Sequence, residues 1–209
     1  MHLFFWFIIY LLKGFFHLFY KCKIEGKDHP YKGSAIIAPN HTSFLDPPII
    51  GMAWPEETHY LARESLFHPF YMGWLLRKLN SHPVQGSAQD IQSFKTICKL
   101  LETGKKVVIF PEGERSYDGE LLDIKGGIAT LALRMKCPII PTYIHGAYEA
   151  WPRTSNRPKL GSALICLFGD PIPIEPYLEM NKKQAQEALR KEVQKRIELL
   201  KSKVMSGDI

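Results

Sequence analysis

Short apolar runs alternate with segments of helical spacing along most of the chain after residue 30, and this alternation limits the possible folds more than any other feature. The runs SAIIA at 34–38 and VVIF at 107–110 stand between polar or proline positions, as buried strands do. Alternating strands and helices build an α/β domain. We therefore expect a central mixed, largely parallel β-sheet flanked by helices.

Cap and stop residues locate the remaining elements. Ser87 can cap a helix with Asp90 in its first turn and Gly104 at its end, and Asn181 with Gln184 forms a capping box for the last helix. The other elements that we expect are helices at 65–79 and 125–136 and strands at 139–144 and 163–168.

The size of the chain favours one folded domain. Its 209 residues are enough for a single substantial core, and a composition of 45% hydrophobic and 23% charged residues excludes a disordered chain. The cysteines lack the paired short spacing of a zinc site or redox dithiol, so we expect reduced thiols in a cytosol-facing protein. They are Cys22, Cys98, Cys137 and Cys166.

A net charge of +6 should attract anions. Anionic lipid and acidic proteins are possible partners, whereas nucleic acid is not expected, because no aromatic-and-basic recognition motif accompanies the charge. Residues 181–209 hold eight basic and four acidic residues at helical spacing. This pattern is typical of a solvated helix face, and a surface for lipid headgroups or an acidic partner is the alternative.

Residues 3–20 form the most apolar stretch and lack the basic start and cleavage site of a signal peptide. A helix of this length reaches about 27 Å, marginal for a bilayer core of ~30 Å. A stripe of polar and amphipathic side chains instead favours a helix that lies in one leaflet, although a core helix is the alternative. The stripe is Trp6, Tyr10, Lys13, His17 and Tyr20.

The expected organisation is thus a membrane-anchoring helix at 1–23, monotopic or a single anchor, followed by one domain at 24–209. Lys21 and Lys23 follow the apolar stretch and favour the cytoplasmic face of a phospholipid membrane. The apolar face of the stretch 61–75, which overlaps the helix expected at 65–79, can meet either that membrane or the core. It contains Phe67, Phe70, Tyr71, Trp74 and Leu75.

The first motif that carries chemistry is NHTSFLDPP at 40–48, directly after a predicted strand. A histidine can take a proton at neutral pH, and a carboxylate can fix its tautomer, so His41 and Asp46 form a candidate dyad. A loop entering a helix would bring the two together, and Pro47 limits regular helix there. The alternative is a histidine hydrogen-bonded in a turn.

The second motif is FPEGERS at 110–116, directly after the VVIF run. Gly113 lets the backbone approach a ligand closely, and the guanidinium of Arg115 suits phosphate. Glu112 can hold Arg115 or contact hydroxyl groups of a ligand. A β-turn with a surface ion pair is the alternative interpretation.

These two motifs and the later CPIIPTYI, in this order, resemble the glycerolipid acyltransferase family, which includes 1-acylglycerol-3-phosphate acyltransferase. The resemblance covers most of residues 35–145. It implies that His41 deprotonates the acceptor hydroxyl while Asp46 orients the imidazole, and that the hydroxyl attacks an acyl thioester of coenzyme A or acyl carrier protein directly. It implies no metal and no cofactor beyond that thioester.

The resemblance also implies an acceptor-binding set. Glu112, Gly113 and Arg115 match the family's acceptor block, Asn40 belongs to the first block, and Lys125 stands where many members carry a lysine. The function implied is acyl transfer to a lysophospholipid acceptor, 1-acylglycerol-3-phosphate (lysophosphatidic acid), in phospholipid biosynthesis.

One block departs from the family pattern. In SHPVQGS at 81–87, Gln85 and Gly86 occupy the usual position of an arginine that contacts the acceptor's phosphate, and Glu114 replaces a common threonine. A lysophospholipid that carries a headgroup, or glycerol-3-phosphate, therefore becomes an alternative acceptor. Otherwise another cation has to substitute for the arginine, and the candidates are Arg77, Lys78 and Lys105.

Two other classes of protein remain as alternatives. A non-enzymatic membrane-binding module would explain the apolar start and the positive charge, but not His41 beside Asp46. A hydrolase is disfavoured, because the sequence has no Gly-x-Ser-x-Gly elbow, no His-Glu-x-x-His motif and no P-loop.

Overall fold

The computed structural model describes residues 2–26, 31–84 and 91–208. Within these ranges a seven-stranded sheet has the order β1-β7-β6-β2-β5-β3-β4, and every neighbouring pair is parallel except β6 with β7. The predicted mixed, largely parallel sheet is confirmed. The strands are β1 (Lys21–Glu25), β2 (Ala35–Pro39), β3 (Thr58–Arg63), β4 (Ser81–Val84), β5 (Lys106–Val108), β6 (Ile139–His145) and β7 (Ala163–Phe168).

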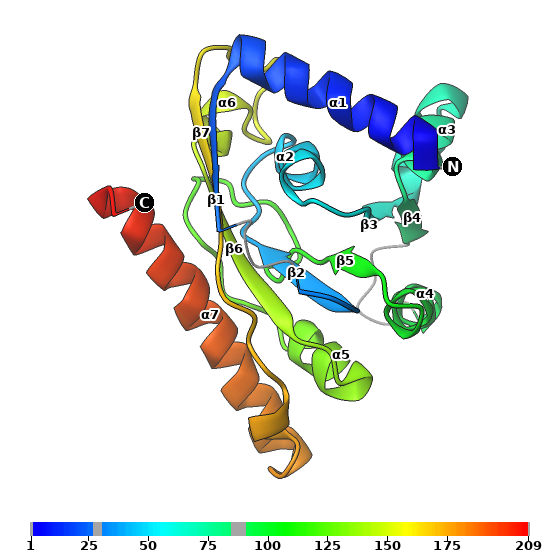
Figure 1. Cartoon of the computed structure of the whole chain (residues 1–209), viewed down its shortest axis with the longest axis vertical. Helices are drawn as coiled ribbons and strands as arrows, with labels where there is room; N and C mark the ends of the chain where they lie inside the picture. Colours follow the sequence, from blue (N-terminus) through cyan, green and yellow to red (C-terminus); the bar gives the residue numbers. More distant parts are fainter. Residues whose placement is uncertain (1, 27–30, 85–90, 209) are drawn as a thin grey trace.

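Helices cover both faces of this sheet, with α1 and α2 on one side and α4, α5 and α7 on the other (Figure 1). Adjacent residues of β2 point to opposite faces, so Ile36 belongs to one core and Ile37 to the other, and both are fully buried. The helices are α1 (His2–Phe19), α2 (Asp46–Ala53), α3 (Phe70–Lys78), α4 (Ile91–Glu102), α5 (Gly127–Met135), α6 (Ala147–Ala150) and α7 (Lys182–Ser206), with 3-10 turns η1 (Glu64–Phe67) and η2 (Glu175–Tyr177).

The helix expected at 65–79 is wrong as one element, because Pro69 divides it into η1 and α3. Proline has no backbone N–H to continue the first turn, but its carbonyl accepts a hydrogen bond from Gly73 N at 2.8 Å and so starts the second helix. The strand expected at 107–110 is also shorter, since β5 ends at Val108. Asn181 caps α7 as predicted, accepting from Gln184 N at 3.0 Å, whereas Ser87 and Asp90 lie outside the described residues.

Helix α1 has two apolar faces with different surroundings. Phe5, Ile9 and Phe16 are buried in the core between α1, α2 and the sheet. The opposite face is exposed, and Leu3 keeps 90% of its surface accessible. One face of α1 is thus part of the core, as the alternative of a core helix expects, and the exposed face leaves membrane association a prediction. Among the described residues, no helix has both the length and the apolar character needed to cross a membrane.

Candidate active site

Three loops meet at one edge of the sheet because β2 lies between β5 and β6 and runs parallel to both. Loop 40–45 follows β2, loop 109–118 follows β5, and the segment 146–155 follows β6. The carboxyl ends of parallel strands point to the same edge, which is where α/β proteins usually collect their functional groups. The first two loops contain the two sequence motifs.

His41 and Asp46 are in direct contact. The imidazole Nδ1 lies 2.8 Å from Asp46 Oδ2, and the ring stacks on Phe110 with 3.7 Å between centroids. Asp46 is fully buried, whereas the side chain of His41 is 18% exposed. The carboxylate is thus an acceptor for Nδ1–H, and this tautomer leaves a lone pair on Nε2 for a substrate proton.

Main-chain amides hold the Asp46 carboxylate in place. Its Oδ2 also accepts hydrogen bonds from Thr42 N and Ser43 N, each at 2.8 Å, which closes the loop between β2 and α2. The expectation that Pro47 limits regular helix here is wrong, since α2 begins at Asp46. Prolines are tolerated in a first helical turn, where backbone N–H groups have no helical partner anyway.

Glu112 connects the first two loops from inside the protein. Its carboxylate accepts hydrogen bonds from His41 N at 2.6 Å and Leu122 N at 2.8 Å, and only 1% of the residue is exposed. A further main-chain bond, from Ser116 N to His41 O at 2.8 Å, joins the same loops. Both carboxylate oxygens of Glu112 therefore accept from main-chain amides, which favours a positioning role over contact with an acceptor's hydroxyls.

Burial raises the pKa of Glu112 to about 7, although the two backbone amides oppose this rise. A carboxyl whose pKa is raised by folding stabilises the protein below its unfolded pKa, and this contribution is lost as the pH rises through about 7. Glu112→Gln removes the titration, so the difference in melting temperature between wild type and variant should shrink from pH 5 to pH 8. A difference that stays constant across this range would contradict the assignment.

Gly113 and Lys125 are packed against each other. Gly113 has a φ of +79°, and a Cβ built on it would collide with the Lys125 side chain, whose Nζ would be 2.9 Å away. Lys125 N also donates to Pro111 O at 2.9 Å. The ammonium of Lys125 thus lies over the turn of the second motif, and any side chain at position 113 would displace it.

Arg115 reaches back over the first loop. Its guanidinium stacks on the ring of Phe44 at 3.7 Å, and its Nη1 is buried without a hydrogen-bond partner among the described residues. The segment after β6 packs against the same ring, because Phe44 and Trp151 have centroids 5.2 Å apart. A buried guanidinium N–H that lacks a partner is an available donor for a ligand.

Asn40 has a different place from the other candidate residues. Its Oδ1 accepts from Ile144 N at 2.7 Å and its Nδ2 donates to Ile144 O at 3.0 Å, with 2% of the residue exposed. The side chain extends the pairing of β2 with β6 beyond the last strand residue. Asn40 therefore positions the His41 loop, and its amide is used within the protein.

The structure does not bring the suggested substitutes for the missing arginine to this edge. Arg77 and Lys78 lie on α3 beside a cleft lined by Phe67, Phe70 and Trp74. Lys105 precedes β5, at the opposite end of that strand from the second motif. Gln85 and Gly86 lie outside the described residues.

Sequence reasoning missed four residues at this edge, Phe44, Phe110, Trp151 and Arg153. The aromatic residues within the two motifs were not considered separately. Trp151 and Arg153 follow β6, and the third motif had already identified that strand, so its end was the available signal. Among the described residues, no group of three or more His, Cys, Asp or Glu side chains could hold a metal ion.

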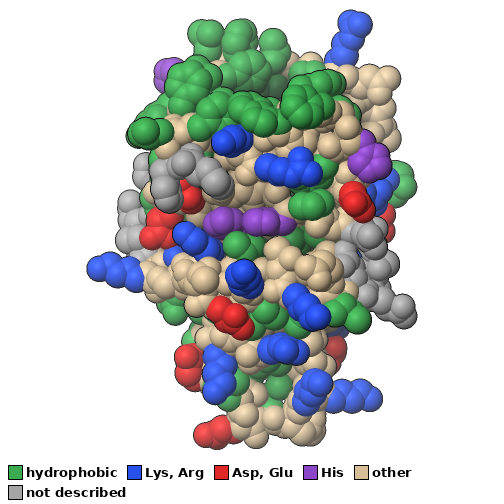
Figure 2. Space-filling view, turned by 90° about the vertical axis from the view of Figure 1, so that its right-hand side faces the viewer, with side chains coloured by type: hydrophobic (Ala, Val, Ile, Leu, Met, Phe, Trp, Pro, Cys, Tyr) green, Lys and Arg blue, Asp and Glu red, His purple; other side chains and the backbone are tan. Residues whose placement is uncertain are grey.

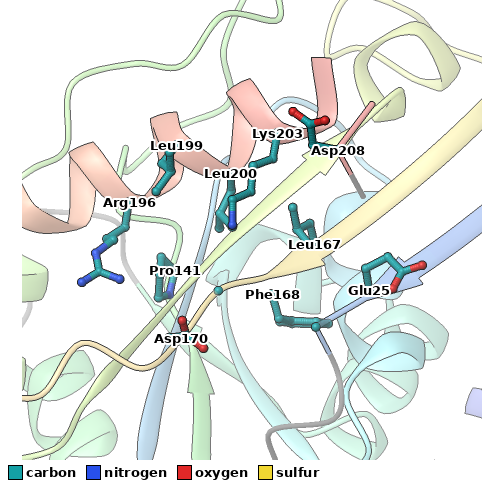
Figure 3. Close-up of a pocket in the computed structure, with 12 residues that line it drawn as sticks. Glu25, Pro141, Leu167, Phe168, Asp170, Arg196, Leu199, Leu200, Lys203 and Asp208 are labelled. Carbon is teal, nitrogen blue, oxygen red and sulfur yellow. The ribbon is translucent and has the colours of Figure 1, made fainter. Parts of the chain in front are cut away.

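A separate cavity of about 270 Å³ lies between α7 and the strand ends of β1 and β7 (Figure 3). None of the seven candidate site residues lines it. Acidic and basic side chains surround an apolar floor made partly by Leu167 and Leu200. The proposed chemistry is therefore unconnected with this cavity. Its charged residues are Glu25, Asp170, Arg196, Lys203 and Asp208.

The fold agrees with what comparison with known proteins finds. The family model described as "Acyltransferase" matches residues 21–145, more than half of the chain, and so the chain belongs to the acyltransferase family. This match includes both sequence motifs and the strand β6. The protein is thus an enzyme of the acyl-transferring class.

Several relatives carry one name. A 1-acyl-sn-glycerol-3-phosphate acyltransferase of Bacillus subtilis is 28% identical over 87% of this chain and 89% of its own length. One from Limnanthes douglasii is 33% identical over 65% of this chain, which spans about half (49%) of that relative. The crystal structure of the 1-acyl-sn-glycerophosphate acyltransferase PlsC of Thermotoga maritima has the same fold, with a TM-score of 0.78, 23% identity and coverage of 94% of this chain and 79% of that one.

Proposed function

We propose that this enzyme transfers a fatty acyl group from an acyl thioester to the free hydroxyl of 1-acylglycerol-3-phosphate. The contact of 2.8 Å between His41 and Asp46, on loops that also hold the Arg115 guanidinium, is the observation that carries this proposal. The name shared by the relatives supports the same acceptor. Glycerol-3-phosphate and a headgroup-bearing lysophospholipid remain the alternative acceptors.

In the proposed reaction, His41 Nε2 takes the proton of the acceptor hydroxyl as its oxygen attacks the thioester carbonyl. Asp46 accepts Nδ1–H throughout and stabilises the imidazolium that forms. The tetrahedral intermediate then breaks its carbon–sulfur bond, and the imidazolium returns the proton to the leaving thiolate. The products are an ester and a free thiol, and no acyl-enzyme forms.

We assign the acceptor's phosphate to the positive side of the same edge. Two groups can donate to phosphate oxygens here: Arg115 Nη1 in the second motif, which has no partner among the described residues, and the ammonium of Lys125, which lies over that motif's turn. Because Gly113 has no side chain, the main chain of the second motif can lie close to the Lys125 ammonium. Glu112 and Asn40 act in this proposal through the main chain of the loops that they hold.

The proposed site of membrane contact is an apolar patch formed by Leu3, Phe7, Tyr10 and Leu11 of α1 with Phe70, Tyr71 and Trp74 of α3. All seven are exposed, and the two helices touch where Phe4 packs edge-on against Trp74 at 5.1 Å. Figure 2 shows hydrophobic side chains gathered at this end of the molecule with lysine and arginine side chains below them. Such a border suits a helix pair lying in one leaflet beside lipid headgroups.

The proposed boundary between an anchor at 1–23 and a catalytic domain at 24–209 falls within β1, which pairs with β7. Because α1 also buries one face in the core, removing the segment would uncover core residues. Substitutions confined to the exposed face are therefore the appropriate test of the anchor, since they leave the buried contacts of Phe5 and Ile9 in place.

Replacing Leu3, Phe7 and Phe70 together with glutamine should weaken binding to phospholipid vesicles at least about tenfold. Burying one large apolar side chain contributes ~1.5–3 kcal/mol, and the variant removes three. Vesicle co-sedimentation measures the effect. Leu178→Gln with Met205→Gln is the matched control, because both are exposed apolar residues outside the patch. Equal binding of the triple variant and wild type would exclude this patch as the contact.

The acyl acceptor is tested directly with the purified enzyme in mixed vesicles. Acyl-coenzyme A and acyl carrier protein thioesters are each combined with 1-acylglycerol-3-phosphate, glycerol-3-phosphate and 1-acylglycerophosphoethanolamine, and products are identified by mass spectrometry. We expect 1-acylglycerol-3-phosphate to give the largest kcat/KM. A larger value for another acceptor would replace the proposed substrate, and vesicle binding without transfer to any acceptor would favour the membrane-binding module.

A further inference from the structure

The segment after α6 is attached to the His41 loop. Ser43 Oγ donates to Trp151 O at 2.7 Å, Phe44 N donates to the same oxygen at 3.3 Å, and Ser43 forms an isolated bridge with Pro152. The chain after β6 thus stays at the edge where the first two loops meet. The next residue, Arg153, is held at that edge.

Arg153 contacts the loop after β5 at three points, two of them in the second motif. Its guanidinium stacks on the Tyr117 ring at 3.7 Å, its Nη1 donates to Arg115 O at 2.8 Å, and the same nitrogen lies 3.6 Å from Glu114 Oε2. The side chain is 25% exposed, so it is ordered by packing while part of it still faces solvent. A guanidinium has five N–H donors, and these contacts leave several of them available to a ligand.

The side chain of Arg153 therefore lies against the backbone of Arg115, and the charges of the two guanidinium groups interact. Burial is the main cause of a lowered pKa for Arg115; the positive charge of Arg153 and, less strongly, that of Arg63 lower it further, whereas Asp46 opposes the shift. Glu114 offsets this repulsion only partly, because its side chain is 48% exposed and solvent screens it. The buried Nη1 of Arg115 has no partner among the described residues. An anion between the two groups would relieve their repulsion and accept from donors that the protein leaves unused.

We infer that Arg153 is the second guanidinium of the acceptor-phosphate site and selects acceptors whose phosphate is a monoester. The inference rests on the proposed function. A monoester carries up to two negative charges and three terminal oxygens, enough for two planar forks of donors, whereas a phosphate bearing a headgroup has one charge and two such oxygens. Arg153 thereby supplies the positive charge that Gln85 and Gly86 do not.

The test compares Arg153→Gln with Arg153→Lys and with Arg157→Gln, an exposed arginine of the same segment. For 1-acylglycerol-3-phosphate we expect Arg153→Gln to raise KM about 10- to 100-fold, as for a lost hydrogen-bonded charge, with little change in kcat. Arg153→Lys should show a smaller increase in KM than Arg153→Gln, since lysine keeps the positive charge but lacks the planar pair of N–H donors of a guanidinium. Arg157→Gln should behave as wild type. For 1-acylglycerophosphoethanolamine, the KM of Arg153→Gln should change much less.

A binding measurement separates ligand contact from loop support. Glycerol-3-phosphate is used as a competitive inhibitor. Its inhibition constant should be higher for Arg153→Gln than for the wild type, by a factor similar to the increase in KM. Two results would overturn the inference and leave Arg153 with a structural role. One is an unchanged KM for the monoester, and the other is a decrease in kcat that is equal for both acceptors. Tyr117→Leu gives an independent variant if Arg153→Gln does not fold: it keeps both arginines, and an unchanged monoester KM would count against the site.

The two proposals fail in different ways. If wild-type enzyme transfers no acyl group to 1-acylglycerol-3-phosphate, the proposed function fails and the inference fails with it. If the wild type is active and Arg153→Gln matches it with the monoester, only the inference is lost.

Discussion

Replacing His41 with alanine should lower acyl transfer by about 10²- to 10⁴-fold, the contribution expected of a general base. The imidazole is the group of the dyad that faces solvent, with its Nδ1 held by Asp46 and its face against Phe110. Asp46 keeps two main-chain donors in the variant, so the loop should persist. Initial rates at saturating thioester and lyso-lipid measure the loss, and a thermal melt checks the fold.

The matched control is His68→Ala, which removes an exposed imidazole from the turn before α3. It should retain the wild-type rate. Vesicle binding should be the same for both variants, because neither changes the apolar patch. Turnover of His41→Ala at the wild-type rate would exclude His41 as the base and, with it, the proposed chemistry.

The Asp46→Asn variant should also lose about 10²-fold or more of the activity while keeping the fold. An asparagine oxygen in the place of Oδ2 can still accept from Thr42 N, Ser43 N and His41 Nδ1–H. The negative charge opposite the imidazolium is gone, however, so the protonated base that forms during attack is less stable. Steady-state rates measure the effect, together with denaturant unfolding of the same sample.

Asp46→Ala distinguishes the electrostatic role from the structural one. It leaves two buried backbone amides without acceptors, and each costs about 1–3 kcal/mol of unfolding free energy. We therefore expect Asp46→Ala to be clearly less stable than Asp46→Asn. An Asp46→Asn variant with wild-type activity would show that orientation alone is enough and that the charge of Asp46 is dispensable.

The fold class and the main dyad could be predicted from the sequence because both depend on local patterns. Buried strands such as β2 are continuous apolar runs, and His41 and Asp46 lie five positions apart in one motif. The strands β1, β3 and β4 were not predicted. They contain charged, polar or proline residues, and only their neighbours in the sheet define them as strands.

The roles within the site were harder to predict because they depend on contacts between distant segments. Glu112 belongs to the motif expected to bind the acceptor, yet its carboxylate faces the main chain of His41, 71 positions away. Asn40 bonds to Ile144 across 104 positions. Arg153 lies outside the three motifs and reaches Arg115 only because β6 and β5 end at the same edge of the sheet. Spacing within a motif contains no information about such pairings.

The hydrogen bonds that join the His41 loop to distant parts of the chain have a consequence for synthesis on the ribosome. The loop depends on Glu112, Ile144 and Trp151, so a nascent chain cannot assemble it before residue 151 has emerged. Helix α1 is translated first, and its partner α2 soon follows. The proposed membrane patch needs only α1 and α3, so on that proposal the growing chain can contact lipid well before it can turn over a thioester.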